Sequence, residues 1–419
     1  MLFLTILCSI CLMGFAVLYL FWGQKVANLY LAQRLQNSDP AYTPRATVIL
    51  PLRGNDPFLI DCLTGLLNQD YPEYAVKIVV DHVDDPAFSV VNQYLVEHLH
   101  PHCQVSLRNH SSGKCGLKNE ALIQAVNELD EATEVFAWLD SDVVPHRSWL
   151  RDLVAPLQKS HIGVASGIRW YAPRDANPGT LVRAVWNAAA VIQMLSLEIA
   201  WGGSIALSRQ VFQNPLLVSS WSKMMWDDTG LKAISSKMDL NIGFAPAATM
   251  VNQESISFRS CFHFIARQLM NVRFYHPHWR WIAGLGIVAF SSKLILMCLT
   301  LVFLIQGHWL EVGIITAILI LASGCIAAVL FRTDTQVRQL VQAREEKLQR
   351  LPLRTTGILW LTIYVYGAAL FAALRTQTIN WRGVIYQISP PHQIQITHYE
   401  PYQQPDTSSQ QLEIENTSL

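Results

Sequence analysis

The feature that most constrains this chain is a long uncharged run directly after the first residue. Residues 2–22, LFLTILCSICLMGFAVLYLFW, contain no Asp, Glu, Lys or Arg. At about 1.5 Å per residue, a helix of this length crosses a hydrocarbon layer of roughly 30 Å. A cleaved signal peptide is the alternative, but the positive charges Lys25, Arg34 and Arg45 follow the run and no small-residue cleavage site is evident. We therefore expect residues 1–23 to be an uncleaved transmembrane anchor.

Three further apolar segments lie in the last third of the chain, at 283–306, 311–331 and 355–374. They predict transmembrane helices within residues 281–376. The stretch 332–354 between the last two is rich in Arg and Lys, which places it in the cytoplasm. The chain is thus predicted to be a multi-pass integral membrane protein that contacts the lipid bilayer directly.

The number of crossings decides where the C-terminus lies. If all four apolar segments cross, the C-terminus is outside, unless the fourth segment is re-entrant or the region around Lys293 lies flat on the membrane. The C-terminal segment 377–419 is rich in Gln, Ser, Thr and Pro from about Pro390. Such a composition cannot bury a core, so this tail is predicted to be disordered.

Composition excludes several other classes of protein. Lys and Arg (31) balance Asp and Glu (31), so no net positive field favours nucleic acid as a partner. The eight cysteines show no paired spacing in a polar stretch, which argues against a zinc site or a disulfide scaffold. Nothing in the composition indicates the oligomeric state.

Residues 24–280 have the size of one α/β domain on the cytoplasmic side. Apolar, β-rich runs alternate there with helix-like stretches. The predicted strands are 46–52, 76–81, 134–140 and 162–167, and the predicted helices are 58–69, 88–99 and 116–129. This alternation indicates a largely parallel sheet with helices on both faces, and ligands of such sheets bind beyond the carboxyl ends of the strands.

Acidic residues stand at those strand ends. Asp81 ends the second predicted strand, Asp140 and Asp142 end the third, and the pair Asp227 and Asp228 precedes a helix-like stretch. Two carboxylates spaced D-x-D can hold one divalent cation, whose remaining ligands are waters and diphosphate oxygens. Each acid alone is equally compatible with a turn or a helix cap, but three acidic clusters at loops of one sheet favour a nucleotide-sugar site.

Several motifs carry a resemblance to a known family. They are PLRGNDP followed by QDYPEY and VVDHVDDPA (within 51–87), LDSDVVP (139–145), GGSIAL (202–207) and WDDTGLKAI (226–234), with INWRGVIY (379–386) near the end. The chain resembles ceramide glucosyltransferases and their bacterial relatives in the inverting glycosyltransferase family 2. The resemblance implies a GT-A fold, a UDP-sugar donor such as UDP-glucose, a divalent cation (Mg²⁺ or Mn²⁺) and a membrane lipid as acceptor.

The family's acidic residues match four positions of this sequence. Asp81 matches the aspartate that contacts the nucleoside, and Asp140 the second aspartate of the donor site. Asp142 completes the D-x-D motif that meets metal and diphosphate, so Asp140 and Asp142 are the implied metal ligands. Asp228 matches the catalytic base, which removes the proton of the acceptor hydroxyl.

The family's fourth element, an Arg or Gln followed two residues later by Arg-Trp, is not intact. The best alignment begins at Arg267 and Gln268 and places Met270 and Asn271 at the Arg-Trp pair. Arg273 is then the nearest cation that replaces the missing arginine. We expect Arg267, Gln268 and Arg273 to include the group that stabilises the leaving diphosphate.

Further predictions concern residues near these motifs. Arg53 follows the first strand and either approaches the nucleotide or belongs to a turn with Gly54. Lys118 stands at a helix start, where it either reaches a phosphate or is a solvated surface lysine. Residues 263–282 combine basic and aromatic side chains and predict an amphipathic helix at the bilayer surface, which ends the cytoplasmic domain.

Three classes of function follow from these observations. The first is an enzyme that moves a hexose, glucose above all, from UDP to the hydroxyl of a membrane lipid. The second is a polysaccharide synthase, against which the few predicted spans and the altered Arg-Trp pair argue. The third is a membrane adaptor without activity, against which the complete set of acids argues. The sequence identifies neither the lipid nor the hexose, because single contacts decide such choices.

Overall fold

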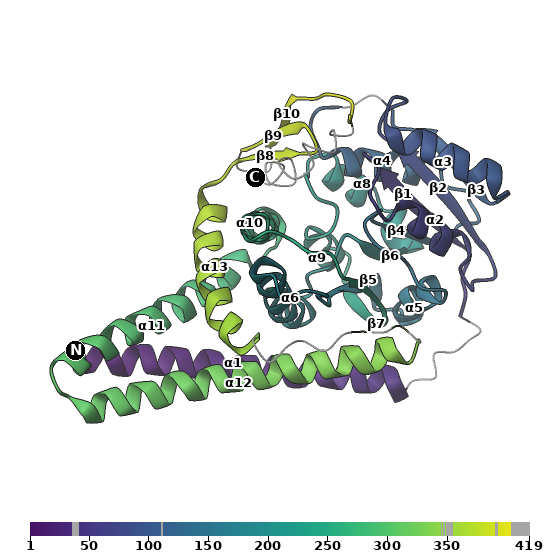
Figure 1. Cartoon of the computed structure of the whole chain (residues 1–419). Helices are drawn as coiled ribbons and strands as arrows, with labels where there is room; N and C mark the ends of the chain where they lie inside the picture. The colour runs from purple at the N-terminus through teal and green to yellow at the C-terminus, as the bar shows by residue number, and fades with distance from the viewer. Residues whose placement is uncertain are drawn as a thin grey trace.

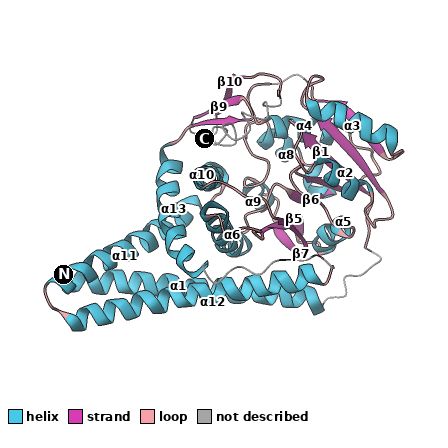
Figure 2. Cartoon of the chain, in the orientation of Figure 1, coloured by secondary structure: helices cyan, strands magenta, loops and turns pink. Residues whose placement is uncertain are grey.

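The structure is a computed structural model that describes residues 1–35, 42–109, 112–344, 346, 348, 355–389 and 393–403. It contains a domain built around a central sheet, from which three long helices extend together to one side (Figures 1 and 2). A small second sheet lies near the C-terminal end of the described chain.

The central sheet has seven strands in the order β3-β2-β1-β4-β6-β5-β7. Neighbouring strands are parallel except that β6 runs antiparallel to both β4 and β5. The strands are β1 (Ala46–Leu52), β2 (Tyr74–Val80), β3 (Cys103–Leu107), β4 (Val135–Leu139), β5 (Ile162–Tyr171), β6 (Ser204–Ser208) and β7 (Asn241–Asn252). The carboxyl ends of β1, β2 and β4 therefore meet at one edge, and Arg53, Asp81 and Asp140 follow these ends directly.

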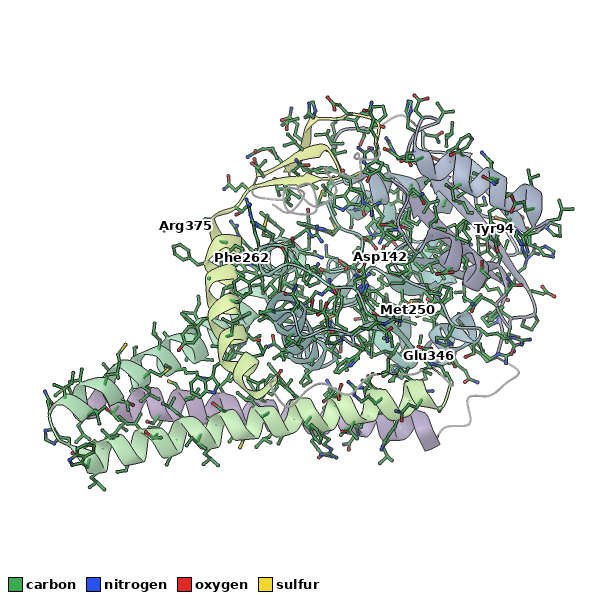
Figure 3. The ribbon with its side chains drawn as sticks, in the orientation of Figure 1. Tyr94, Asp142, Met250, Phe262, Glu346 and Arg375 are labelled. Atoms are coloured by element: carbon green, nitrogen blue, oxygen red, sulfur yellow. The ribbon has the colours of Figure 1, made fainter. Side chains whose placement is uncertain are left out.

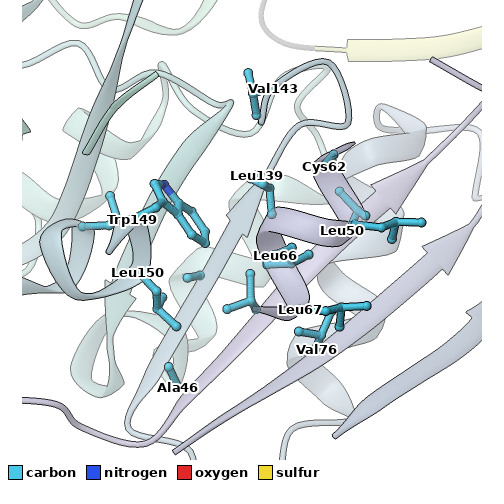
Figure 4. Close-up of a cluster of buried hydrophobic side chains, with 14 of the residues drawn as sticks. Ala46, Leu50, Cys62, Leu66, Leu67, Val76, Leu139, Val143, Trp149 and Leu150 are labelled. Carbon is cyan, nitrogen blue, oxygen red and sulfur yellow. The ribbon is translucent and has the colours of Figure 1, made fainter. Parts of the chain in front are cut away.

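Helices cover both faces of this sheet, as the alternating pattern predicted. The helices between the first strands are α2 (Leu59–Leu67), α3 (Pro86–Glu97) and α4 (Leu117–Asn127). Shorter helices follow: α5 (Trp149–Val154), the 3₁₀ helix Ala155–Gln158, α7 (Arg209–Phe212), α8 (Pro215–Trp221) and α9 (Leu231–Ser236). Figure 4 shows Leu50 of β1, Leu66 of α2, Leu139 of β4 and Trp149 of α5 in one core cluster. The expected fold class, a GT-A domain with a mixed sheet and additional long apolar helices, is confirmed.

Within the described residues, five helices are long and apolar enough to cross a membrane. Four correspond to the predicted segments: α1 (Leu2–Leu35), α11 (Trp279–Ile305), α12 (Trp309–Gln342) and α13 (Thr355–Arg375). The fifth, α6 (Pro178–Leu197), was not predicted, and 67% of its most apolar window is buried inside the protein. Because its neighbours are protein side chains rather than solvent or lipid, α6 is a core helix of the domain.

The three extended helices are α1, α11 and α12, and α1 packs against both of the others (Figure 1). Helix α1 continues to Leu35, beyond the predicted end near residue 22, because residues 24–35 are mostly good helix formers (Ala, Leu, Gln, Lys, Arg) and contain no proline. A side chain at Gly23 would lie 2.4 Å from Val329 of α12, so the glycine permits close packing. The prediction of a basic loop from residue 332 is wrong for the first part of that stretch, because α12 continues to Gln342.

The predicted interfacial helix 263–282 is instead two elements. Helix α10 (Phe258–Tyr275) ends before Pro277, and α11 begins at Trp279. Proline disfavours helical backbone in the residue before it, and His276 is accordingly extended (ψ 128°). Helix α10 packs against α6 and α13, so it forms part of the domain interior rather than lying free on a surface.

The C-terminal segment folds back onto the domain. Strands β8 (Thr378–Trp381), β9 (Val384–Ser389) and β10 (Gln393–His398) form an antiparallel sheet, so residues 393–398 form a strand within the region predicted to be disordered from about residue 390. The tail from 404 to 419 lies outside the described residues. Ile396 donates a backbone hydrogen bond to Gly113 (3.0 Å), and Arg382 forms an ion pair with Asp56.

Both ends of the segment that contains α13 therefore touch the same domain. Before α13, the Arg344 guanidinium donates to the carbonyls of Ala247 (2.8 Å) and Thr249 (2.9 Å) in β7. After α13, Arg382 contacts Asp56. A single crossing by α13 would separate these contacts, so the geometry favours the re-entrant alternative for the fourth apolar segment over a full crossing.

Candidate active site

Asp81, at the end of β2, is enclosed by cations. Its carboxylate accepts hydrogen bonds from Arg53, from Arg108 at 2.7 Å and from the Tyr399 hydroxyl at 3.2 Å. Arg53 follows β1, Arg108 follows β3 and Tyr399 follows β10. Arg53 also donates to two backbone carbonyls of the C-terminal segment. Three strand ends and the C-terminal segment therefore meet at one buried charge cluster.

Asp140 and Asp142, after β4, are partly exposed and share one cation. Arg169 Nη2 lies 2.7 Å from Asp142 Oδ1 and 3.8 Å from Asp140 Oδ2. Lys118, near the start of α4, places Nζ 2.6 Å from Asp140 Oδ1. Burial alone would raise the pKa of Asp140, but Lys118 and Arg169 hold it below its usual value. Burial raises the pKa of Asp142. The negative charges of neighbouring aspartates raise this pKa further, and the positive charge of Arg169 opposes the rise. Figure 3 labels Asp142 in the domain, away from the three extended helices.

Asp227 is held from several sides in the loop between α8 and α9. Trp138 of β4 donates its indole N–H to Asp227 Oδ2 at 2.6 Å, and Lys118 Nζ lies 3.1 Å from the same oxygen. The Trp221 indole donates to the Asp227 backbone carbonyl at 3.0 Å. Lys118 thus joins Asp227 to Asp140, and Asp227 acts as a support for the loop that carries Asp228.

Asp228 follows Asp227 in the same loop and remains partly exposed. Its carboxylate accepts hydrogen bonds from the Gly202 N–H (2.9 Å), the Thr229 N–H (2.5 Å) and the Asn271 side-chain amide (2.9 Å). A side chain at Gly202 would lie 3.0 Å from Asp228 Oδ2, so the glycine lets the backbone approach the acid. Asp228 is therefore a fixed carboxylate with one side open to the cavity described below.

The burial of Asp227 predicts a pH-dependent stability. Burial raises the pKa of Asp227 to about 7, with the charges of Asp228 and Asp140 adding and Lys118 opposing. Because folding then favours the protonated acid, this contribution is present at acidic pH and is lost as pH rises through 7, by on the order of 2 kcal/mol between pH 5 and pH 8. Asp227→Asn should flatten this part of the dependence of Tm on pH. Equal slopes in variant and wild type would contradict the assignment.

The three candidates on α10 have different surroundings. Arg267 is half-buried and, among the described residues, makes no hydrogen bond; its electrostatic neighbours include Asp142, Arg169 and Arg382. Gln268 lines the cavity beside Asp228. Arg273 points elsewhere: its guanidinium donates to the carbonyls of Ala373 (2.7 Å) and Thr376 (3.1 Å) at the end of α13. The structure thus brings Arg267 and Gln268 to the site and leaves Arg273 at a helix end.

Sequence reasoning did not single out five residues of this site. Arg108 follows β3 as Asp81 follows β2, so the strand-end pattern contained a signal for it. Arg382 lies in INWRGVIY, which belongs to the family motifs, but its contact with Asp56 joins residues 326 positions apart. Arg169 lies inside β5, Tyr399 lies in a tail of low complexity, and Asn271 replaces the family tryptophan. No local pattern marks these three.

A cavity of about 280 Å³ begins at Asp228 and continues between the long helices. At one end it is lined by Arg169, Trp201, Asp228 and Asn271. Beyond them the walls are mostly apolar side chains of α1, α6, α11, α12 and α13. The arrangement can thus admit an elongated apolar molecule whose polar end meets the Asp228 carboxylate.

This chain is similar to known proteins in sequence and in chain path. A stretch of 61 residues is 36% identical to the ceramide glucosyltransferase of Pyricularia oryzae, although the match covers only 14% of this chain and 12% of that protein. The structure of a mannosyltransferase from Pyrobaculum calidifontis, in complex with GDP-Man and Mn²⁺, has 18% identity, with 88% of this chain and 96% of that chain covered and a TM-score of 0.49.

A second solved structure is glucosyl-3-phosphoglycerate synthase from Mycobacterium tuberculosis, with 16% identity, 59% and 83% coverage and a TM-score of 0.36. At these identities and TM-scores, the two solved structures are similar to this protein only in the path of the chain. Residues 6–394 match the family model described as Glycosyl transferase family 21, whereas the motifs alone had pointed to family 2. The resemblance to the ceramide glucosyltransferase kind of enzyme is confirmed, and the chain belongs to glycosyl transferase family 21.

Proposed function

We propose that this glycosyltransferase moves a hexose, glucose from UDP-glucose, to the hydroxyl of a membrane lipid with inversion at the anomeric carbon. One observation carries the proposal: Asp228 lines an apolar cavity that continues between helices long enough to cross a membrane. A water-soluble acceptor gains nothing from such walls, whereas a lipid tail buried there is stabilised by about 25 cal/mol per Å² of apolar area.

Asp228 is proposed as the general base. The acceptor hydroxyl loses its proton as its oxygen attacks the anomeric carbon, and the nucleoside diphosphate leaves from the opposite face. A carboxylate fixed by Gly202, Thr229 and Asn271 needs no reorganisation to take that proton. Asp227 is less suited to the role because Trp138 and Lys118 already occupy its buried oxygen.

The residues present fit a divalent cation. Asp140 and Asp142 offer two partly exposed carboxylates on one side, both near the same Arg169 nitrogen. Mg²⁺ and Mn²⁺ are held by few protein oxygens when water and phosphate supply the rest, so a larger group of ligands is not required. No cluster of three or more such ligands occurs among the described residues. Such a cation supplies charge neutralisation to the diphosphate.

The proposed donor site uses the remaining cluster. Asp81 is the proposed nucleoside contact, with Arg53 as its fixed partner, and Lys118 positions Asp140. Because Tyr399 already donates to Asp81, we propose that the segment 399–403 adjusts when a nucleoside binds. Arg267, which lacks a protein acceptor in the described part of the chain, is the proposed cation for the leaving diphosphate.

The proposed setting is a multi-pass membrane protein with its catalytic domain on the cytoplasmic face. The basic stretch after α12 and the charges after the N-terminal run support this orientation. A polysaccharide synthase of the same fold is less consistent with the site, since a polar sugar chain is poorly matched by mostly apolar walls.

The test is transfer from labelled UDP-glucose by the full-length protein in membranes with and without added Mg²⁺ or Mn²⁺. We expect label in a chloroform-soluble product of one added hexose, and loss of product with a chelator. A water-soluble product, or a product of many sugars, would overturn the lipid proposal. UDP-galactose and UDP-N-acetylglucosamine, assayed in parallel, test the choice of hexose.

A further inference from the structure

A lysine lines the cavity far from its catalytic end. Lys293, in the middle of α11, is only 6% exposed, and it lines the same cavity as Asp228. Its Nζ lies 3.6 Å from the ring centroid of Trp360 in α13. No other charged side chain of α1, α6, α11, α12 or α13 lines this cavity, as far as the described residues extend.

Lys293 has no acidic partner and no hydrogen-bond acceptor within the described residues. The sequences of α1, α6, α11 and α13 contain no Asp or Glu. The two acids of α12 already have partners: Glu311, in its first turn, faces His308, and Asp334, in its C-terminal third, pairs with Arg338. The Trp360 ring face contributes about 0.5–2 kcal/mol, which is less than the loss of hydration of a buried ammonium. An ionisable group in such a place calls for a partner.

The position of Lys293 along α11 sets where that partner lies. Asn271 contacts Asp228 and belongs to α10, and α11 begins soon after α10 ends, so the start of α11 marks the catalytic end of the cavity. Ile282 and Lys293 both line the cavity and are 11 residues apart, which is about 16 Å along a helix. Leu12 and Trp22 of α1 line it over a similar length.

We infer that Lys293 forms a second polar subsite, which binds an oxygen-bearing group on the acceptor lipid remote from the hydroxyl that receives the sugar. The acceptor is then an amphiphile with oxygen at both ends of an apolar body, rather than a lipid whose buried part is hydrocarbon alone. Only the identity of the bound molecule, the acceptor lipid, rests on the proposed function. The presence of a polar subsite at Lys293 does not depend on it.

Binding tests the subsite independently of transfer. The full-length protein in detergent is titrated with tetradecanediol, which has a hydroxyl at each end, and with tetradecanol, which has one. Native mass spectrometry counts the bound molecules and gives a Kd for each. We expect wild type to bind the diol at least tenfold more tightly, and Lys293→Met to abolish this preference by weakening the diol alone. Lys25→Met, an exposed lysine of α1 outside the cavity, is the matched control.

Equal Kd values of wild type for the diol and the mono-alcohol would overturn the inference. A preference for the diol that survives in Lys293→Met would also overturn it. Should that variant fail to fold, wild type alone decides through chain length: the preference for diol over mono-alcohol must rise from hexanediol to tetradecanediol, and a flat series contradicts the subsite. Because none of these readouts needs UDP-glucose, absence of sugar transfer would count against the proposed function without affecting the result for Lys293.

Discussion

Asp228→Asn is expected to lower kcat for sugar transfer by about 10²- to 10⁴-fold, the usual contribution of a general base. The amide has the shape of the carboxylate and keeps an oxygen for the Gly202 or Asn271 contact, but it cannot take the proton of the acceptor hydroxyl. Donor binding, measured by calorimetry with UDP, should change little because Asp228 is not proposed to contact the nucleotide. Transfer is measured as the rate of formation of labelled lipid.

Asp239→Asn is the matched control for this substitution. Asp239 is exposed in the same domain, and its backbone has φ 56°, a conformation that asparagine tolerates well. This variant should keep wild-type kcat and Tm. A folded Asp228→Asn protein with near wild-type turnover would show that another group removes the proton, and the assignment of the base would then be wrong.

Arg267→Gln is expected to lower kcat by about 10²- to 10³-fold, as removal of one preorganised charge from a developing anion does elsewhere. Burial lowers the pKa of Arg267, and the positive charges of Arg169 and Arg382 lower it further. Tyr171 and Asp142 have the opposite effect on this pKa. A guanidinium in these surroundings, with no hydrogen bond among the described residues, gains when a diphosphate arrives.

Arg273→Gln provides the contrast on the same helix. Its guanidinium bonds two carbonyls at the end of α13, so the substitution should reduce the free energy of unfolding by about 1–3 kcal/mol and leave kcat nearly unchanged. The pair of variants separates catalysis from support of α13. If Arg273→Gln lost turnover while Arg267→Gln did not, the alignment of the altered Arg-Trp element would have to be shifted.

The parts of the fold that were predictable depend on local patterns. Strands such as 46–52 are continuous apolar runs, and Asp81 and Asp140 follow strand ends directly, so periodicity and position were sufficient to find them. Topology then brings these acids together, because the carboxyl ends of parallel neighbours share one edge. The assignment of Asp228 as the base needed the family resemblance, since a WDD loop alone has no defined place in a sheet.

The parts that were not predictable depend on contacts between distant segments. Helix α6 has the composition of a membrane span, and only its burial by other elements shows that it is not one. The prediction of an outside C-terminus assumed that every apolar helix crosses the membrane, whereas the contacts of Arg344 and Arg382 with one domain favour a re-entrant α13. Arg273 was chosen for its proximity in sequence to the altered motif, but two residues on a helix separate side chains by about 200°.

The return of β8–β10 to the domain has a practical consequence for dissecting this enzyme. Its proposed donor-binding half is assembled from two stretches of chain, so proteolytic removal of everything after α10 would take Arg382 and Tyr399 with it. The Arg273 contact with Thr376 shows, however, that the end of α10 and the start of β8 are near neighbours. A short peptide joining them would bypass α11, α12 and α13, and removal of α1 as well would separate the proposed nucleotide site from the apolar cavity.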